Sequence, residues 1–82
     1  MDNNEIIERV KKVISEVLGI DKDKIQLESR FVEDLGAESV QSLELVAAFE
    51  EEFNIEMNEE KALEIKTVGK AIDFIKEYLD KK

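Results

Sequence analysis

Apolar side chains recur three or four residues apart along most of this sequence, and this spacing is what most limits the fold. It matches the 3.6-residue turn of an α-helix, whereas the strict alternation typical of a β-strand is not sustained anywhere in the chain. Proline is absent and only three of the 82 residues are glycine, so few residues interrupt a helix. The sequence therefore predicts an all-α fold with no sheet.

The apolar spacing predicts three main helices and one short helix. We expect them at residues 4–18, 39–53, 59–64 and 68–79. The expected caps are Asp2, Asn3 or Asn4 for the first helix, Asn58 for the third and Thr67 for the fourth, and Gly19 ends the first. A chain of this length builds one core, so we predict a single domain over residues 1–82. Its fold is a small four-helix bundle with a long loop between the first two helices.

The loop from residue 20 to residue 38 has no helical period. A loop this long in a small domain is usually functional or held to the core. We expect apolar side chains to anchor it, and a short helical turn to follow Ser29. The expected anchors are Ile25, Leu27, Phe31, Val32 and Leu35.

The expected helix over residues 39–53 has two apolar faces. They are Leu45, Val46, Phe49 and Phe53 on one side, and Val40, Leu43 and Ala47 on the other. We expect the first face to be buried. The second is rotated only partly away from it and has two interpretations: it widens the core, or it is an exposed apolar patch with a charged rim, as in a docking surface.

The chain is poor in reactive side chains. It contains no cysteine and no histidine, which excludes disulfides, thiol nucleophiles, Ser-His catalysis and most zinc sites. An EF-hand also fails, because Gln26 stands where the central glycine belongs and Val32 where the final glutamate belongs. A stand-alone hydrolase or transferase is therefore disfavoured. We predict no specific metal site, although weak surface binding of Ca²⁺ or Mg²⁺ by acidic residues stays open. Any reactive group is expected to come from a cofactor or a partner.

Negative charge is concentrated in residues 31–60. This segment holds ten acidic residues and no Lys or Arg, whereas the other 52 residues hold 11 acids and 12 bases. The net charge of −9 argues against binding to nucleic acid or to an anionic membrane. The concentrated negative charge has two interpretations: a solvated surface that keeps the protein soluble, or a field that attracts a basic partner. In either case the acids repel one another, and salt should screen this repulsion.

Ser39 follows Gly36 and Ala37 at the expected start of a helix. Gly36 permits a positive φ, and the unpaired N–H groups of a helix start favour a negative group. Two interpretations are open. Ser39 is only an N-cap in a non-enzymatic, acidic helical interaction module, or its hydroxyl carries a phosphate ester.

Much of the sequence resembles the acyl carrier proteins, a family of phosphopantetheine-binding carriers. The resemblance rests on Phe31-Val32-Glu33-Asp34-Leu35-Gly36-Ala37-Glu38-Ser39, continuing through Glu44-Leu45-Val46 to Glu50-Glu51-Glu52-Phe53, and on Thr67-Val68 followed by Ala71-Ile72-Asp73-Phe74-Ile75. It covers nearly the whole chain, with the same order of helices.

The resemblance implies a carrier with no catalytic activity of its own. It implies that a phosphopantetheinyl transferase, with Mg²⁺, moves 4′-phosphopantetheine from coenzyme A onto Ser39, whose arm then holds acyl groups as thioesters. It also implies docking of acyl-transferring and synthase enzymes through their basic patches. The matching recognition positions are Glu38, Glu44, Glu50, Glu51 and Glu56 among the acids, and Val40, Leu43 and Ala47 among the apolar residues. A cavity between the helices shelters an acyl chain in this family, and Ala47 and Ala48 would leave room for one.

Several positions depart from the family's usual pattern. Glu38-Ser39-Val40 replaces Asp-Ser-Leu, Gln41 stands where an acid is common, and Ala47 where methionine is common. Val40 and Ala47 both make the apolar docking patch smaller. We therefore hypothesise a carrier dedicated to one pathway rather than to general fatty-acid synthesis. A polyketide or aminoacyl-type carrier stays open, although Leu35-Gly36-Ala37 looks more like the fatty-acid branch.

The sequence also predicts where the chain works. Its longest apolar runs span only a few residues, and its acidic, polar start is unlike a signal peptide. We expect a cytoplasmic monomer.

Overall fold

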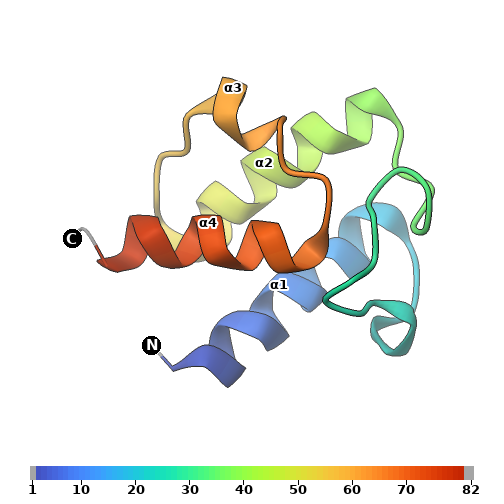
Figure 1. Ribbon diagram of the computed structural model, residues 1–82, viewed down its shortest axis with the longest axis horizontal. Helices are drawn as coiled ribbons and strands as arrows, with labels where there is room; N and C mark the ends of the chain where they lie inside the picture. Colours follow the sequence, from blue (N-terminus) through green and yellow to red (C-terminus); the bar gives the residue numbers. More distant parts are fainter. Residues whose placement is uncertain (1, 81–82) are drawn as a thin grey trace.

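A computed structural model gives the fold of residues 2–80. Four α-helices follow one another: α1 (Asn3–Leu18), α2 (Ser39–Phe53), α3 (Glu59–Ala62) and α4 (Val68–Asp80), with a 3₁₀-helix, η1 (Lys22–Lys24), in the long loop. The described residues form no strand, only an isolated bridge between Arg30 and Thr67. The predicted all-α bundle is confirmed (Figure 1). Met1, Lys81 and Lys82, part of the predicted 1–82 domain, lie outside the described residues.

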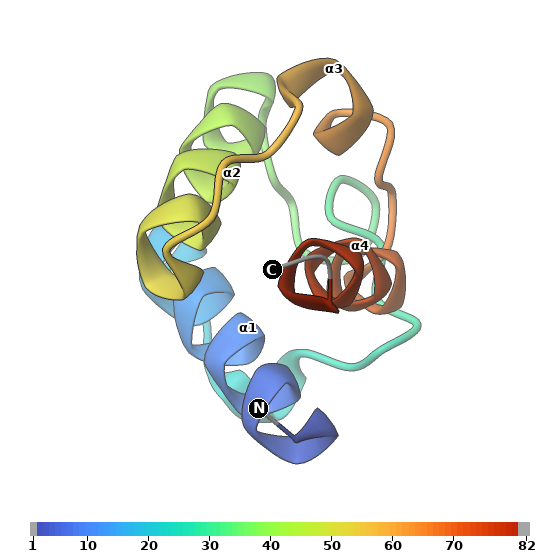
Figure 2. The same cartoon turned by 90° about the vertical axis from the view of Figure 1, so that its left-hand side faces the viewer.

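The helices surround one apolar interior. In Figure 2, α2 and α4 face each other across it, with α1 below and α3 above. Its most deeply buried large side chains are Val10, Ile14, Ile25, Val68 and Ile75. The face of α2 predicted to be buried, Leu45, Val46, Phe49 and Phe53, is buried. Between residues 2 and 80, every helix is too short or too polar to cross a membrane.

Side chains at the helix ends satisfy backbone groups as the sequence predicts. Asp2 caps α1 by accepting a hydrogen bond from the Glu5 N–H at 2.8 Å, so α1 begins one residue earlier than expected. Asn58 caps α3 by accepting from the Lys61 N–H, and Thr67 accepts from the Lys70 N–H at the start of α4. Gly19 ends α1 with a φ of 68°, a left-handed conformation that glycine adopts without strain.

Helix α3 is shorter than predicted, ending at Ala62 instead of residue 64. The Glu64 N–H bonds to the Lys61 carbonyl and the Ile65 N–H to the Ala62 carbonyl, each at 3.1 Å. These i to i+3 bonds tighten the chain into turns and end the α-helical pattern.

The long loop is anchored by fewer side chains than predicted. Ile25 and Phe31 are buried and Leu35 packs against the core, but Leu27 and Val32 are exposed, so those two assignments were wrong. Backbone contacts hold the loop near Leu27 instead, because the Gly69 N–H donates to the Leu27 carbonyl at 2.8 Å. A Cβ at Gly69 would lie 3.1 Å from that oxygen, so the close approach favours glycine. The turn predicted after Ser29 spans residues 31–35.

Candidate functional site

The start of α2 is capped by Glu38, not by Ser39. Glu38 has an extended backbone and occupies the N-cap, and Ser39 is the first helical residue. The Gln41 side-chain oxygen accepts a hydrogen bond from the Glu38 N–H at 3.0 Å. The interpretation of Ser39 as only an N-cap was therefore wrong, because Glu38 and Gln41 form the capping arrangement.

The loop before α2 turns sharply so that Ser39 begins the helix at the surface. Gly36 has a φ of 71°, as predicted, and the Ala37 N–H bonds to the Phe31 carbonyl at 2.8 Å. Asp34 supports the same turn by accepting from the Arg30 N–H at 2.8 Å. That backbone bond, followed by the Arg30 side chain, lowers the pKa of the Asp34 carboxyl below its ordinary value.

Ser39 differs from the other three serines of the chain. The Ser15 hydroxyl donates to the Ile20 carbonyl, the Ser29 hydroxyl accepts from the Gln26 N–H, and the Ser42 hydroxyl donates to the Glu38 carbonyl. All three of these residues are half-buried. Ser39 is exposed, and its hydroxyl has no hydrogen-bond partner among residues 2–80. Its oxygen is therefore the one most open to reaction from solvent.

The second apolar face of α2 is exposed, which decides between its two interpretations. Val40 is 65% exposed and Leu43 is 44% exposed, and Ala47 is exposed as well. These side chains do not widen the core. They form an apolar strip along the outside of α2 that begins next to Ser39.

The predicted recognition acids lie around this strip but are not equivalent. Glu38, Glu44, Glu51 and Glu56 are exposed. Glu50 is half-buried, and its carboxylate accepts the Met57 N–H at 3.0 Å, which ties the loop before α3 to α2. Glu51 lies on the other edge of the helix, lining a hollow with Val13 and Val17 of α1. Glu50 thus has a structural contact that its sequence position did not reveal.

Three of the ten acids in segment 31–60 are paired with bases from outside it. The Arg30 Nε lies 3.6 Å from a Glu33 carboxylate oxygen and 3.4 Å from an Asp34 carboxylate oxygen. The Arg9 Nε lies 2.7 Å from a Glu52 carboxylate oxygen. The sequence places no base inside the segment, but Arg30 directly precedes it, and folding brings α1 against Glu52. Within the described chain, no group of three or more acids is arranged to hold a metal ion.

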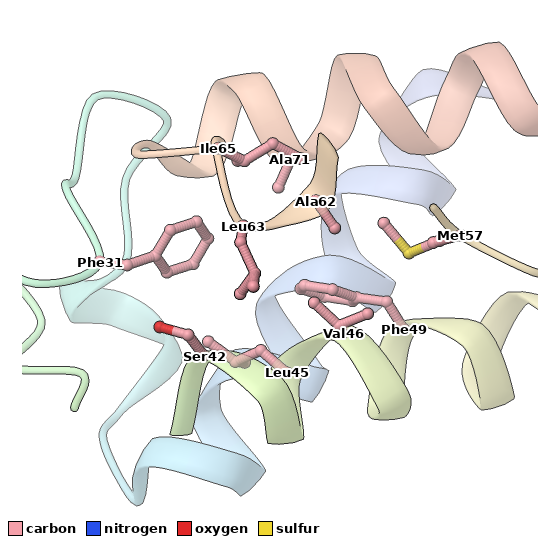
Figure 3. Close-up of a pocket in the computed structure, with 10 residues that line it drawn as sticks. All are labelled: Phe31, Ser42, Leu45, Val46, Phe49, Met57, Ala62, Leu63, Ile65 and Ala71. Carbon is pink, nitrogen blue, oxygen red and sulfur yellow. The ribbon is translucent and has the colours of Figure 1, made fainter. Parts of the chain in front are cut away.

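A partly open cavity of about 40 Å³ lies between α2, α3 and α4. Its wall is apolar except for the Ser42 hydroxyl, and Figure 3 shows Leu63 pointing from the end of α3 toward α2. The expectation that Ala47 and Ala48 leave room for an acyl chain was wrong, because neither lines this cavity. Ala47 is exposed, and Ala48 faces the hollow beside α1.

A larger open groove of about 620 Å³ lies outside the cavity and includes Ser39. It is lined by Val32, Ala37, Glu38, Ser39, Ser42, Leu43, Leu63 and Lys66. Val32, Leu63 and Lys66 were not predicted to belong to the site. They come from the loop and from the segment after α3, so no spacing within α2 could have identified them; only tertiary packing brings them near Ser39.

A family model described as "Phosphopantetheine attachment site" matches residues 8–75 of the chain. The chain belongs to this family of phosphopantetheine carriers. The family attaches 4′-phosphopantetheine covalently to a serine, and all four serines of this chain lie within the matched residues.

Membership in this carrier family gives the chain a general role. Phosphopantetheine carriers work with transferases and synthases, and their domains are typically non-catalytic. An exposed apolar strip with an acidic rim is the type of surface that a basic partner enzyme recognises through charge and apolar contact.

Proposed function

We propose that Ser39 carries the 4′-phosphopantetheine arm, and that residues 1–82 act as one carrier domain holding acyl groups as thioesters. The observation that carries the proposal is the contrast among the serines: Ser39 alone is exposed with a hydroxyl that no other described residue binds. A phosphate ester there also lies at a helix start, where free N–H groups favour negative charge.

The proposed attachment needs only a nucleophile from this chain. The Ser39 oxygen bonds to the phosphorus of the phosphopantetheine half of coenzyme A, and the bond to the 3′-phosphoadenosine 5′-phosphate half breaks. The hydroxyl proton passes to a base of the transferase or to water. The partner transferase and its Mg²⁺ supply the activation, and the arm supplies the thiol that the sequence lacks.

Intact mass tests this assignment directly. After incubation with coenzyme A, Mg²⁺ and a broad-specificity phosphopantetheinyl transferase, the wild type should gain the mass of one phosphopantetheine group. Ser39→Ala should gain none, whereas Ser42→Ala, three residues along the same helix, should still be modified. Both variants should melt close to the wild type, because the Ser39 hydroxyl has no partner among residues 2–80 and the Ser42 hydroxyl makes only an exposed hydrogen bond. A modified Ser39→Ala protein, or a folded wild type that the transferase leaves unchanged, would overturn the proposal.

We infer that the carrier serves a dedicated lipid or polyketide-type pathway rather than general fatty-acid synthesis. The small side chains of Val40 and Ala47 on the exposed strip support this, because they offer a partner less apolar contact. General ketoacyl synthases should elongate the loaded wild type poorly. Val40→Leu combined with Ala47→Met should improve elongation, and efficient elongation of the wild type would contradict the inference.

We propose that partner enzymes bind this carrier through the exposed face of α2 and the residues beside it. The proposed contacts are Glu38, Val40, Leu43, Glu44, Ala47, Glu50, Glu51 and Glu56. Because Glu50 also holds the Met57 N–H, its substitution should affect stability as well as binding. Glu44→Lys is the cleaner test, and it should weaken docking without lowering the melting temperature.

We also propose that the carrier is a cytoplasmic monomer. Light scattering during gel filtration should give a single mass close to 9.4 kDa for the unmodified chain.

A further inference from the structure

The two peptide groups on either side of Glu38 are both hydrogen-bonded to the first turn of α2. The Glu38 N–H belongs to the peptide between Ala37 and Glu38, and it donates to the Gln41 side-chain oxygen at 3.0 Å. The Glu38 carbonyl belongs to the peptide between Glu38 and Ser39, and it accepts from the Ser42 N–H at 2.9 Å. The φ and ψ of Glu38, −89° and 167°, are the two rotations that relate these peptides. The Gln41 side chain therefore helps to fix the backbone immediately before Ser39.

The chain is also held on the other side of this peptide. Ala37 is buried, and its N–H bonds to the Phe31 carbonyl at 2.8 Å. The hydrogen bond from the Glu38 N–H to Gln41 thus joins a buried anchor in the loop to the start of the helix. Without a side-chain acceptor at residue 41, the Glu38 N–H would be left to water and the junction between loop and helix would lose a contact.

The position of the Ser39 oxygen depends on this backbone. The Ser39 hydroxyl has no hydrogen-bond partner among residues 2–80, so no side chain of the described residues holds it directly. In the proposed transfer, this oxygen approaches the phosphorus while the bond from phosphorus to the 3′-phosphoadenosine 5′-phosphate half breaks. A displacement of about 1 Å in a reacting group can slow such a step by about 100-fold. The backbone at Glu38 therefore bears on the reaction although it touches no reacting atom.

Gln41 has the length and the acceptor that this contact needs. A glutamine or glutamate at the third helical residue can reach back to the N–H of the N-cap residue. Gln41 stands where an acid is common in the resembling family, and it keeps a side-chain oxygen as acceptor while carrying no charge. Its oxygen is engaged with the backbone of its own chain, which indicates that Gln41 acts on Ser39 through Glu38.

We propose that Gln41 is a positioning residue for the transfer of phosphopantetheine onto Ser39. Its side-chain oxygen holds the peptide between Ala37 and Glu38, and this sets where the Ser39 oxygen meets the transferase and its coenzyme A. The proposal rests on attachment of the arm to Ser39. It requires a hydrogen-bond acceptor at residue 41, and it requires neither a charge there nor a contact between Gln41 and the transferase.

Two substitutions of Gln41 test the proposal. Gln41→Met has a side chain of similar length and no charge but lacks the acceptor, whereas Gln41→Glu keeps an acceptor oxygen. Each protein would be mixed with excess broad-specificity transferase, coenzyme A and Mg²⁺, and intact mass would follow a single turnover at several transferase concentrations. The maximal rate then reports on the transfer and the half-saturating concentration on docking. Gln41→Met should lower the maximal rate by about fivefold or more and change the half-saturating concentration by less than about twofold, and Gln41→Glu should keep the maximal rate within about twofold.

A structural measurement and a matched control accompany the kinetics. Exchange of the Glu38 amide proton, followed by NMR on the unmodified proteins, should be faster in Gln41→Met and unchanged in Gln41→Glu. Asp2→Ala removes a capping bond from α1, the 2.8 Å contact with the Glu5 N–H. This control loses stability for the same type of reason but should transfer at the wild-type rate, because its cap does not adjoin Ser39.

Three results would overturn the positioning role. They are a wild-type maximal rate in Gln41→Met, an equal loss of rate in Gln41→Glu, or an equal loss of rate in Asp2→Ala. The second result would mean that the amide hydrogens of Gln41 touch the transferase, and the third that lost stability alone slows the transfer. A wild type that gains no phosphopantetheine mass would instead overturn the attachment to Ser39 itself.

Discussion

The two ends of α2 are built in opposite ways. At its C-terminal end, Arg9 of α1 donates to both the carboxylate and the backbone carbonyl of Glu52, and its guanidinium lies 4.9 Å from the centre of the Phe53 ring. At its N-terminal end, Ser39 and Val40 face solvent. The C-terminal end is held by a charged contact over a buried ring, and the N-terminal end is exposed to solvent.

This difference shows how a small domain exposes a reactive group without losing its fold. The charged contact with α1 lies at the C-terminal end of α2, and Glu38 and Gln41 cap its start, so the start of the helix needs no contact from Ser39. Changes at the two ends should therefore have different consequences. Substitutions near Phe53 should affect stability, and substitutions near Ser39 should affect modification and docking.

The largest expected difference is between Phe53→Ala and Val40→Ala. Phe53 is 4% exposed, so its truncation should lower the free energy of unfolding by about 3–5 kcal/mol. Val40 is 65% exposed, and its truncation should change the free energy of unfolding by no more than about 0.5 kcal/mol. Urea unfolding of both variants measures the change in the free energy of unfolding. Similar losses of stability at the two sites would contradict the comparison.

The contact between Arg9 and Glu52 should make a smaller but measurable contribution to the free energy of unfolding. A double-mutant cycle of Arg9→Met and Glu52→Gln should give a coupling of about 1–2 kcal/mol, since the two side chains are 31% and 19% exposed and 2.7 Å apart. The exposed pair Arg30 and Asp34, near the other end of α2, provides the matched cycle and should show no resolvable coupling. Equal couplings would show that burial does not distinguish the two ends.

The same contact should make stability depend on pH. The hydrogen bond from Arg9, with the charge of Lys12, lowers the pKa of the Glu52 carboxyl below 4.5, although partial burial opposes this. A carboxyl with a lowered folded-state pKa stabilises the fold above its unfolded pKa, and this contribution is lost as the pH falls from about 4.5 through the lowered value. Glu52→Gln should flatten this part of the acid unfolding curve. An unchanged curve would mean that the contact with Arg9 does not form in solution.

The smallest expected effect is that of salt. Seven acids of segment 31–60 form no ion pair within residues 2–80, and like charges one helical turn apart destabilise by a few tenths of a kcal/mol per pair. Moderate salt or millimolar Mg²⁺ should therefore raise the melting temperature slightly by screening. The rise should be larger in Glu52→Gln, which no longer has a favourable pair for salt to weaken. A melting temperature that stays constant or falls with added salt in both proteins would contradict the predicted screening.

Local patterns predicted the helices well. The apolar spacing gave the bounds of α2, and the caps at Asp2, Asn58 and Thr67 formed as short-range chemistry requires. Where the sequence failed, long-range packing was responsible. Val32 looks like an anchor in the sequence but lies at the surface, because Phe31 takes the inward position next to it.

The candidate site was only half predictable for the same reason. Ser39 and the strip of Val40, Leu43 and Ala47 lie on one helix, so their positions follow from the helical period. Leu63 and Lys66 reach the groove through the path of the chain after α3, which no local pattern encodes. The contact of Glu50 with the Met57 N–H likewise depends on that path.

The capping of α2 by Glu38 and Gln41 has a consequence for the working cycle of the carrier. Because the helix start does not use the Ser39 hydroxyl, esterifying that oxygen removes no hydrogen bond from the backbone. The bare and loaded forms should then share one α2, and a visiting enzyme meets the same surface before and after each transfer. The acyl group changes from one partner enzyme to the next, while the docking surface of the carrier stays the same.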